Sequence, residues 1–402
     1  MTSEWHEVPL RELVGYISKG IAPSYAEEAS ETTIRVLNQK CNRNFRISYG
    51  DSRLHDTLKK KVPPERYVKP DDILINSTGA GTAGRIAQIE DVPSATTIDG
   101  HMILIRSNGK VTQKFLGYAL KAHQWEVLQL DEGSTGQTEL NRDRLLDEIM
   151  INYPVSFDEQ NAIVGTLESI DRKLIVNEQL NDNLEQQAQA IYHERFETVS
   201  PNDLPSDWRI VTLGEVTTIS NKSFNPLKEP EILLEHYSIP AFDEARFPVF
   251  ELSTSIKSNK FIIDASCFMI SKLNPTTKRV WKPYCLTGNA VCSTEFIVYK
   301  AKDQSITDFL YSVIDSGSFS DFMCSHVTGS TGSRQRTTPS DTLSYELILP
   351  SEDELAEFQS LVSPMYAQMR INAIENDKLK RLRDSLLPKL MSGEIDVSSV
   401  HL

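Results

Sequence analysis

Two segments of the chain share one pattern of asparagines and apolar residues. The first is Leu174-Ile-Val-Asn177-Glu-Gln-Leu-Asn181-Asp-Asn-Leu184, and the second, 195 residues later, is Met369-Arg-Ile-Asn372-Ala-Ile-Glu-Asn376-Asp-Lys-Leu379. The apolar residues around both segments follow alternating steps of three and four residues, which is the spacing of a coiled-coil seam. The sequence therefore predicts two long helices, from Phe157 to about Phe196 and from about Glu352 to Leu390, with the asparagines in their seams.

We expect the two helices to run antiparallel, in a register where the numbers of facing residues sum to 553. Asn177 then faces Asn376, and Asn181 faces Asn372, about a local two-fold axis. Buried asparagines of this kind cost stability but fix the register of a coiled coil. The alternative is that each helix packs separately on its own globular part. Pro364 lies inside the second helix, where it should kink or restart it.

The sequence outside these helices repeats as well. Trp5-x-x-Val8-x-Leu10 recurs as Trp208-x-x-Val211-x-Leu213, and Gly133-Ser-Thr-Gly136 recurs as Gly329-Ser-Thr-Gly332. Because six such matches are collinear, with offsets between 194 and 203 residues, we interpret the chain as an internal duplication. The expected segments are a globular part at 1–154, a helix at 155–200, a second globular part at 201–350, and a helix with a tail at 351–402.

Each globular part is expected to mix α and β structure. Short segments rich in β-branched residues predict strands, and the Gly-Ser-Thr-Gly segments are typical of polar loops. The expected strands are 71–77, 85–89, 101–106, 267–271, 279–285 and 294–300, and the expected helices are 112–130 and 306–326. The predicted fold class is therefore α+β, with two mixed α/β domains separated by two long antiparallel coiled-coil helices.

Composition and charge exclude some classes of function but do not identify one. The net charge is −14, from 42 Lys+Arg and 56 Asp+Glu, and residues 155–200 alone hold 9 acidic side chains against 3 basic ones. The two globular parts are nearly balanced, so charge neither excludes nor supports DNA binding. The five cysteines are scattered, no apolar run is long enough for a membrane span, and the start lacks the plan of a secretion signal. We therefore expect a cytoplasmic protein with reduced thiols.

Several motifs follow one order of domain, helix, domain and helix. They are Trp5-x-x-Val8-x-Leu10, Tyr67-Val-Lys-Pro-Asp-Asp-Ile-Leu-Ile-Asn-Ser-Thr-Gly79, Pro154 with Gln160 and Ile163-Val164, Trp208-x-x-Val211-x-Leu213, Ser293-Thr-Glu-Phe296, and Gly329-Ser-Thr-Gly-Ser-Arg-Gln-Arg336. With these motifs the chain resembles the specificity subunit of type I restriction–modification enzymes over essentially its whole length. The second helix departs from the pattern at its start, where Asp353-Glu-Leu-Ala-Glu357 stands in place of a glutamine-containing segment like Asp158-Glu-Gln160.

The resemblance implies that each globular part is a target-recognition domain, which reads one half of a split, asymmetric site in double-stranded DNA. It implies that the helices set the spacer between the half-sites and dock two modification (methyltransferase) subunits, which ATP-dependent restriction subunits (translocase and nuclease) would join. S-adenosylmethionine and ATP would lie on those partners. This chain would be a non-catalytic subunit with no cofactor, metal or membrane contact of its own. Helices of about 40 residues would be about 60 Å long at about 1.5 Å per residue, so the pair could act as a ruler between the two domains.

The candidate DNA contacts are polar and basic side chains at strand ends and in the Gly-Ser-Thr-Gly loops. Arginine, lysine, asparagine and glutamine can reach base edges or phosphates, and glycine and serine permit a close approach of the backbone. Solvated strand ends and a surface loop with incidental cations are the alternatives. The candidates are Ser77, Thr78, Arg85, Ser134, Thr135, Gln137 and Arg142 in the first half, and Lys272, Asn274, Lys278, Arg279, Ser330, Thr331, Arg334, Gln335 and Arg336 in the second.

Other classes of function have weaker signals. Gly79-x-Gly81-x-x-Gly84, followed by Asp99, formally matches a dinucleotide-binding fingerprint, but the residues after Gly84 alternate as in a strand, which favours a loop between strands. An enzyme that methylates or cuts DNA unaided is disfavoured, because the sequence has no Asn/Asp-Pro-Pro-aromatic segment, no Gly-Lys-Ser/Thr phosphate loop and no HExxH helix. A coiled-coil scaffold that does not bind DNA is the remaining alternative.

Overall fold

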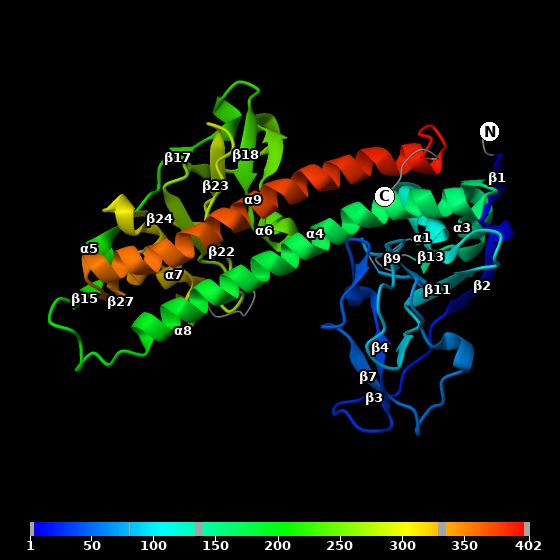
Figure 1. Cartoon of the computed structure of the whole chain (residues 1–402), viewed down its shortest axis with the longest axis horizontal. Coiled ribbons are helices and arrows are strands. Elements are labelled where there is room, and N and C mark those ends of the chain that lie inside the picture. Colours follow the sequence, from blue (N-terminus) through cyan, green and yellow to red (C-terminus); the bar gives the residue numbers. More distant parts are fainter. Residues whose placement is uncertain (1–3, 80, 133–138, 329–334, 398–402) are drawn as a thin grey trace. The chain divides into compact units, whose positions relative to one another are not determined.

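The computed structural model describes residues 4–79, 81–132, 139–328 and 335–397. Contacts divide the chain into two compact units, one of residues 1–173 and 380–402 and the other of residues 174–379. Two long helices, α4 (Phe157–Tyr192) and α9 (Glu352–Met391), each contribute to both units (Figure 1). That the four segments expected from the sequence are separate domains stays a prediction.

The domain of the first unit mixes short strands and helices. Its elements are β1 (Trp5–Pro9), β2 (Val14–Lys19), β3 (Tyr25–Ala26), β4 (Thr33–Leu37), β5 (Asn42–Arg43), β6 (Arg46–Ile47), β7 (Arg53–Asp56), β8 (Ile73–Asn76), β9 (Ile86–Gln88), β10 (Thr96–Ile98), β11 (Met102–Ser107), α1 (Gln113–Ala122), α2 (Gln124–Val127), β12 (Asp131–Glu132), β13 (Glu139–Leu140), α3 (Arg142–Glu148) and β14 (Met150–Pro154). One four-stranded sheet has the order β2-β11-β8-β9 with antiparallel neighbours. A second has the order β10-β4-β7-β3, in which β10 and β4 are parallel.

The domain of the second unit repeats this plan. Its elements are β15 (Arg209–Thr212), α5 (Leu213–Val216), β16 (Thr217–Ile219), β17 (Ser223–Phe224), β18 (Leu233–Tyr237), α6 (Ile239–Ala245), β19 (Val249–Leu252), β20 (Lys260–Ile262), β21 (Cys267–Ser271), β22 (Val280–Trp281), β23 (Ala290–Ser293), β24 (Phe296–Ala301), α7 (Thr307–Asp315), α8 (Gly317–Ser325), β25 (Val327–Thr328), β26 (Arg336–Thr337) and β27 (Glu346–Leu349). The sheet β16-β24-β21-β22 matches the first unit's antiparallel sheet strand for strand. The sheet β17-β20-β23-β18-β19 again contains one parallel pair, β18 with β23. The duplication and the mixed α/β fold class are thereby confirmed.

The central strands are buried on both faces, which explains their continuous apolar sequences. In β8, Ile73 points into a core shared with α1, α4 and α9, whereas Leu74 points into the core between the two sheets. In β21, Phe268 likewise points into the core shared with the helices, and Met269 points into the core on the other face of the sheet. Because successive side chains of a strand point to opposite faces, one short apolar run joins the helices to both layers of each domain.

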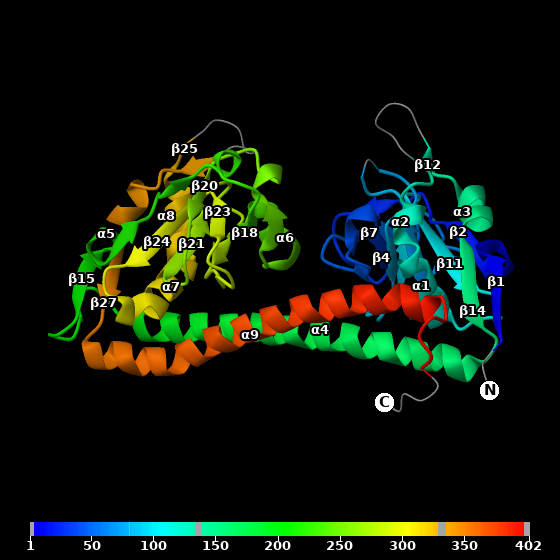
Figure 2. The ribbon, with the colours of Figure 1, turned by 90° about the horizontal axis from the view of Figure 1, so that it is seen from above.

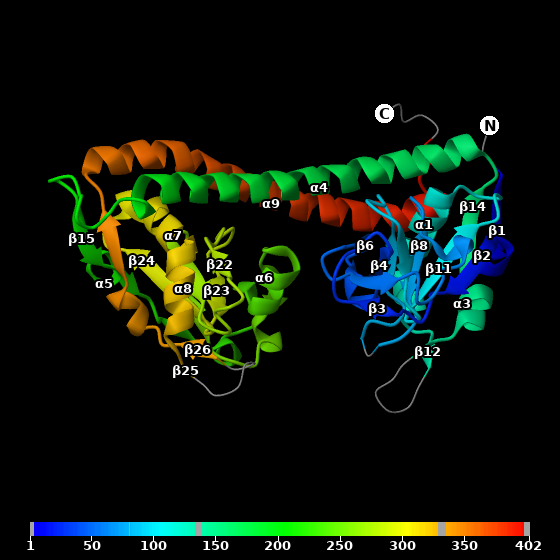
Figure 3. The same ribbon diagram turned by 90° about the horizontal axis from the view of Figure 1, so that it is seen from below.

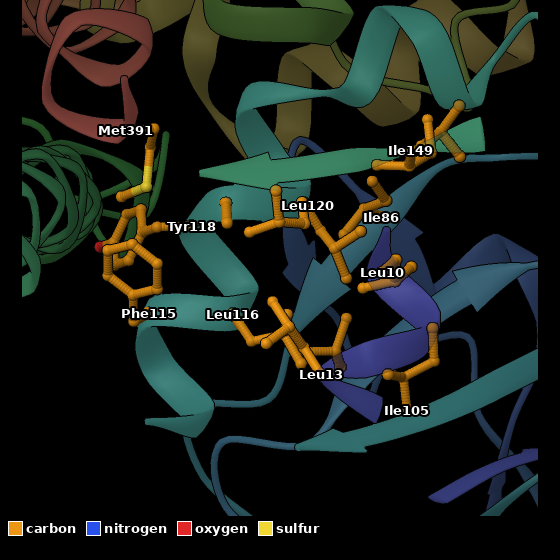
Figure 4. Close-up of a cluster of buried hydrophobic side chains, with 14 of the residues drawn as sticks. Leu10, Leu13, Ile86, Ile105, Phe115, Leu116, Tyr118, Leu120, Ile149 and Met391 are labelled. Atoms are coloured by element: carbon orange, nitrogen blue, oxygen red, sulfur yellow. The ribbon is translucent and has the colours of Figure 1, made fainter. Parts of the chain in front are cut away.

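Helix α1 shows how the helical layer of the first domain is fixed. The side chain of Thr112 accepts a hydrogen bond from the amide of Phe115 and so caps the first turn. Phe115 and Leu116 then lie in the same buried cluster as Met391, at the end of α9 (Figure 4). The core of this domain therefore includes the C-terminal end of the second long helix.

The two long helices run antiparallel and side by side within the second unit (Figure 2). Nδ2 of Asn177 donates to Oδ1 of Asn376 at 2.9 Å, and Nδ2 of Asn372 donates to Oδ1 of Asn181 at 2.8 Å. These are the pairs that the register summing to 553 brings together. Asn177, Asn372 and Asn376 are buried, so their amides satisfy one another away from water. Separate packing of the two helices is therefore wrong.

Three local expectations need correction. Helix α9 continues through Pro364, so the restart expected there is wrong. Phe358 and Val362 before the proline pack in one core with Met365 after it. This packing holds the helix together although the proline removes one backbone hydrogen bond. The helix expected over 306–326 is two helices, because Ser316 leaves the helical conformation to cap α8. The helix expected over 112–130 is likewise α1 followed by α2.

The strand expected over 279–285 is only β22 (Val280–Trp281). Pro283 lies two residues after its end, and a proline has no amide hydrogen to donate to a neighbouring strand. The other expected strands match their observed counterparts to within two residues at each end.

The substitution Asn177→Leu should destabilise the chain by about 1–3 kcal/mol, because it leaves the amide of Asn376 buried without its partner. The double substitution Asn177→Leu with Asn376→Leu should recover most of this loss, since two facing leucines need no partner. Urea unfolding of the purified chain measures both. Asn183→Leu, an exposed position of α4, is the matched control. A single variant as stable as the double variant would contradict the role of the amide pair.

Candidate nucleic-acid interface

The same hairpin occurs in both domains. Strands β12 and β13 pair antiparallel on either side of residues 133–138, and β25 and β26 do so on either side of residues 329–334. In each domain the hairpin lies on the side away from α4 and α9 (Figure 3). The repeated Gly-Ser-Thr-Gly segment is thus the connection between the hairpin strands. Six candidates in it lie outside the described residues, namely Ser134, Thr135, Gln137, Ser330, Thr331 and Arg334.

Each hairpin is attached to the antiparallel sheet in one way. The amide of Leu140 donates to the carbonyl of Ser77 at 2.8 Å, and the amide of Thr337 donates to the carbonyl of Lys272 at 3.1 Å. The candidates that follow β8 and β21 therefore lie beside the second strand of each hairpin. Ser77, Thr78, Lys272 and Asn274 belong to this group.

In the second domain, Arg336 occupies the hairpin strand next to these residues. Its Nε and Nη2 donate to the two carboxylate oxygens of Glu295 at 3.0 and 3.1 Å, and these hydrogen bonds raise the pKa of the guanidinium. The side chain is 42% exposed, so a ligand can reach it. A guanidinium fork that fits a carboxylate also fits a phosphate or the acceptor edge of guanine. A nucleic acid would compete with Glu295 for this fork.

Asn274 adds an acceptor at the same place. Its amide hydrogen binds the carbonyl of Gln335 at 2.9 Å, and its backbone has a φ of +48°. The side-chain Oδ1 is buried and has no hydrogen-bond partner among the described residues. Asn274, Gln335, Arg336 and Lys272 are therefore brought together by the structure.

Two other candidates of the second domain contact helices instead. Arg279 makes a bidentate ion pair with Asp243 of α6, at 2.5 and 2.9 Å. The Lys278 ammonium lies 2.7 Å from both the carbonyl oxygen and Oδ1 of Asp315, the last residue of α7. Burial raises the pKa of the Asp315 carboxyl to about 6, against the opposing effect of Lys278. Both cations link parts of their own domain, which the sequence did not indicate.

In the first domain, the equivalent positions carry different side chains. Thr78 Oγ1 hydrogen-bonds His101 Nδ1 at 2.7 Å, and Glu139 of the hairpin pairs with Lys19 of β2. Ser77 is fully buried, so it supports the strand end and does not present its hydroxyl to solvent.

The side chains of the two candidate arginines of the first domain, Arg85 and Arg142, make no hydrogen bond or ion pair with the described residues of this group. Arg85 donates to the carbonyl of Gly81 at 3.0 Å and so closes the turn between β8 and β9. Arg142 is exposed on the first turn of α3. Strand β9 begins two residues after Gly84, which agrees with a loop between strands at the glycine fingerprint.

Sequence reasoning missed the partners of the candidates: Lys19, His101, Glu139 and Glu295. A signal for two of them existed in the repeat. The carbonyl of His101 accepts from the amide of Ser77, and the carbonyl of Glu295 accepts from the amide of Lys272, at 2.8 and 2.9 Å. Their separation of 194 residues is the offset of the duplication. Matched backbone positions therefore carry His101 and Glu139 in one domain, and Glu295 and Arg336 in the other.

Two negative findings concern only the described part of the chain. None of its helices is long and apolar enough to cross a membrane. It also contains no group of three or more His, Cys, Asp or Glu side chains that could hold a metal ion.

Comparison with known proteins gives consistent matches. Residues 2–186 match the sequence profile of a family described as type I restriction modification DNA specificity domain. The chain is 24% identical over 384 residues to the type I restriction enzyme MjaIX specificity subunit of Methanocaldococcus jannaschii, covering 88% of this chain and 84% of that protein. It is 32% identical over 93 residues to the type I restriction enzyme HindI specificity subunit of Haemophilus influenzae, covering 23% of this chain and 20% of that protein. In fold, it is similar to the S subunit of a type I restriction–modification system from M. genitalium, with a TM-score of 0.58 at 16% identity and 97% and 96% of the two chains covered.

The substitution Asp315→Asn should stabilise the chain above pH 6 and have little effect near pH 4. In the folded chain the carboxyl pKa is about 6 instead of 3.8, so folding favours the protonated acid. The resulting penalty is absent at low pH, grows as the pH rises through 6, and reaches up to about 3 kcal/mol for a shift of about two pH units. Urea unfolding of both proteins between pH 4 and pH 8 measures it. Asp321→Asn, at an exposed position of α8, is the control. An effect of Asp315→Asn that does not change with pH would contradict the burial of the Asp315 carboxylate.

Proposed function

We propose that this chain is a specificity subunit of the type I restriction–modification family, which its matches to the specificity-domain profile and to a known specificity subunit support, and that its two domains read the two halves of a split, asymmetric DNA sequence. In this proposal the chain determines which DNA sequence the complex binds, and methyl transfer takes place on a partner subunit. The chain itself is a non-catalytic subunit that acts in the cytoplasm. S-adenosylmethionine and ATP are bound by the partners.

The repeated hairpin is the observation that carries this proposal. Both domains attach a hairpin to the end of the central strand by the same backbone hydrogen bonds. Two similar hairpins can approach a duplex in similar ways, while the side chains around them differ. Arg336 with Glu295 in one domain and Lys19 with Glu139 in the other would favour different base pairs. This difference supports an asymmetric target.

Local cations must attract the DNA, since the net charge of the chain is −14. Arg336 makes an ion pair with Glu295, and Lys19 makes one with Glu139. DNA phosphates or bases would replace these carboxylates. Each exchange of this kind also releases counterions from the DNA. We therefore propose that binding depends on a small number of contacts and falls steeply as salt rises.

The long helices are proposed to set the spacer between the half-sites. Helix α4 has 36 residues and α9 has 40, which correspond to about 54 and about 60 Å at about 1.5 Å per residue. A duplex rises about 3.4 Å per base pair, so half-sites roughly one helical turn apart on one face of the DNA would fit such a pair.

The helix pair is also the proposed docking surface for two modification subunits, which restriction subunits then join. Val176 of α4 and Ile371 of α9 are 195 residues apart, the offset of the duplication, and are 49% and 55% exposed. The two-fold axis of an antiparallel pair is perpendicular to the plane of the helices, so such equivalent positions share one face. Two exposed apolar side chains related by a two-fold axis favour two copies of one partner.

The methylome of a host that expresses this chain with its modification subunit tests the function. We expect a new split motif that is methylated only when both proteins are present, and a purified complex with two modification subunits by native mass spectrometry. Omission of each protein in turn is the control. A stable complex that methylates no new motif and binds no DNA sequence specifically would favour the coiled-coil scaffold instead.

The substitution Arg336→Ala should weaken recognition of the second half-site alone. We expect the preference for an intact over a scrambled second half-site to fall by about 10- to 100-fold, the range of one bidentate base contact. Binding of the complex to duplexes with either half-site scrambled measures the preference. Lys19→Ala is the reciprocal control and should affect only the first half-site. Equal losses at both half-sites for Arg336→Ala would refute the assignment.

A further inference from the structure

Arg246 joins the second domain to helix α4 from a strained position. It follows α6 and has a left-handed backbone, with a φ of +47°, which is uncommon for a residue other than glycine. Its Nη1 donates to Oε2 of Glu185, in α4, at 2.8 Å. The guanidinium also lies over the ring of Phe242, 5.2 Å from its centroid. Strained residues of this kind persist where the surrounding contacts hold them, and they are frequent at functional positions.

The loop after β22 joins the same place to helix α9. The hydroxyl of Tyr284 donates to the carbonyl of Arg246 at 3.0 Å, and Nη2 of Arg370, in α9, donates to the carbonyl of Tyr284 at 3.2 Å. Phe247 and Tyr284 pack with their ring centroids 5.6 Å apart. Arg246 and Tyr284 therefore connect one corner of the domain to both helices.

Buried groups hold this loop from the inside of the domain. The hydroxyl of Tyr237 accepts from the amides of Tyr284 and Cys285 at 2.8 and 2.9 Å, and it donates to Glu235 at 2.5 Å. Glu235 in turn accepts from the amide of Thr287 at 2.7 Å. Tyr237 and Glu235 are fully buried in β18, an interior strand of the second sheet. Motion of the loop relative to this sheet would leave a buried carboxylate without its donors, which is costly.

We call Glu185, Arg246, Tyr284 and Arg370 the domain-2 latch. The numbers of its two helix residues, Glu185 and Arg370, sum to 555, within two of the register sum of 553. They therefore lie at the same level of the antiparallel pair. The latch touches both helices at one level and leads into the centre of the domain.

The first unit contains an analogous connection made of different residues. Phe45 follows Asn44 in a turn where both have left-handed backbones, with φ values of +63° and +52°. The Lys121 ammonium lies 4.9 Å from the centroid of the Phe45 ring and 3.0 Å from Asp171 of α4, which also accepts from Arg383 of α9 at 3.0 Å. Asp171 and Arg383 sum to 554, again one level of the pair. Two domains with different contact residues thus share one arrangement.

We propose that the domain-2 latch is a positioning device, which fixes the angle of the second reading domain on the helix pair and so determines how strictly the spacer length is enforced. The proposal rests on the proposed function. Adding one base pair to the spacer moves a half-site by about 3.4 Å and rotates it by about 34°, since a turn has about 10.5 base pairs. A domain held to both helices cannot follow this rotation, whereas a released domain can. The helices set the mean spacer, and the latch sets the tolerance around it.

The test uses the complex of this chain with its modification subunit and a plasmid library in which the spacer length varies. The variant Arg246→Ala with Arg370→Ala removes both helix contacts of the latch. We expect methylation at spacers one base pair longer or shorter to rise about tenfold or more relative to the native spacer, with unchanged base preferences in both half-sites. The charge swap Arg246→Glu with Glu185→Arg should restore strictness relative to Arg246→Glu alone.

Arg195→Ala is the matched control. Arg195, in the π-helical turn His193–Glu197 after α4, pairs with Glu357 of α9 at 2.6 Å, so its loss removes an ion pair of the helices without touching the latch. It should leave the spacer distribution unchanged. A wild-type spacer distribution in the latch variant, or a uniform loss of methylation at all spacers, would overturn the proposal.

A distance measurement keeps the test independent of methylation. Spin labels carried by unnatural amino acids at Lys257 and Gln187, both exposed, report the domain and α4 within one unit. We expect a broader distance distribution in the latch variant than in the wild type or in Arg195→Ala. An unchanged distribution would overturn the latch. A wild-type complex that writes no split motif would instead overturn the proposed function, and the spacer proposal with it.

Discussion

Four asparagine side chains in one seam, three of them buried, impose a strict condition on the rest of the structure. The buried Asn177 pairs with Asn376, and the buried Asn372 pairs with the half-buried Asn181. An unpaired buried amide costs about 1–3 kcal/mol, and a single antiparallel register satisfies both pairs. The contacts of the domains with the helices depend on the same register. Glu185 with Arg370, and Asp171 with Arg383, lie at common levels only when the seam is aligned in this way.

Duplication explains how one architecture can serve two different sites. The backbone hydrogen bonds that attach each hairpin recur at the offset of the repeat, and so do the two faces of the central strand. These interactions depend on backbone and on burial, which tolerate changes in exposed side chains. Glu295 can therefore stand where the other domain has His101 without disturbing the sheet. The fold is conserved between the halves by its core, and the halves differ where a ligand would meet them.

The sequence predicted the helices well because the apolar seam repeats over many turns. Its asparagines can satisfy their hydrogen bonds inside the seam in only one register. The sequence also located the hairpins indirectly, through the repeated Gly-Ser-Thr-Gly segment. It could not indicate that Lys278 contacts Asp315 and Arg279 contacts Asp243, because these partners lie 37 and 36 residues away and meet only through tertiary packing. Burial of Ser77 was equally invisible, since a serine at a strand end has no periodic signature. Pro364 misled for a related reason: local propensity predicted a break, and the core around it prevented one.

The carboxylates around the candidate contacts have a consequence for selectivity. Glu295 orders the Arg336 guanidinium in advance, so little side-chain freedom would be lost if a nucleic acid replaced it. A single phosphate offers Arg336 about what Glu295 already offers, and the exchange gains little. A base edge with two acceptors in the right place would offer more. In the proposed function, competition by Glu295 would therefore lower binding to wrong DNA sequences more than binding to the right one, and specificity arises from such a difference of affinities. A chain with a net charge of −14 is consistent with a subunit that must reject most of the DNA it meets.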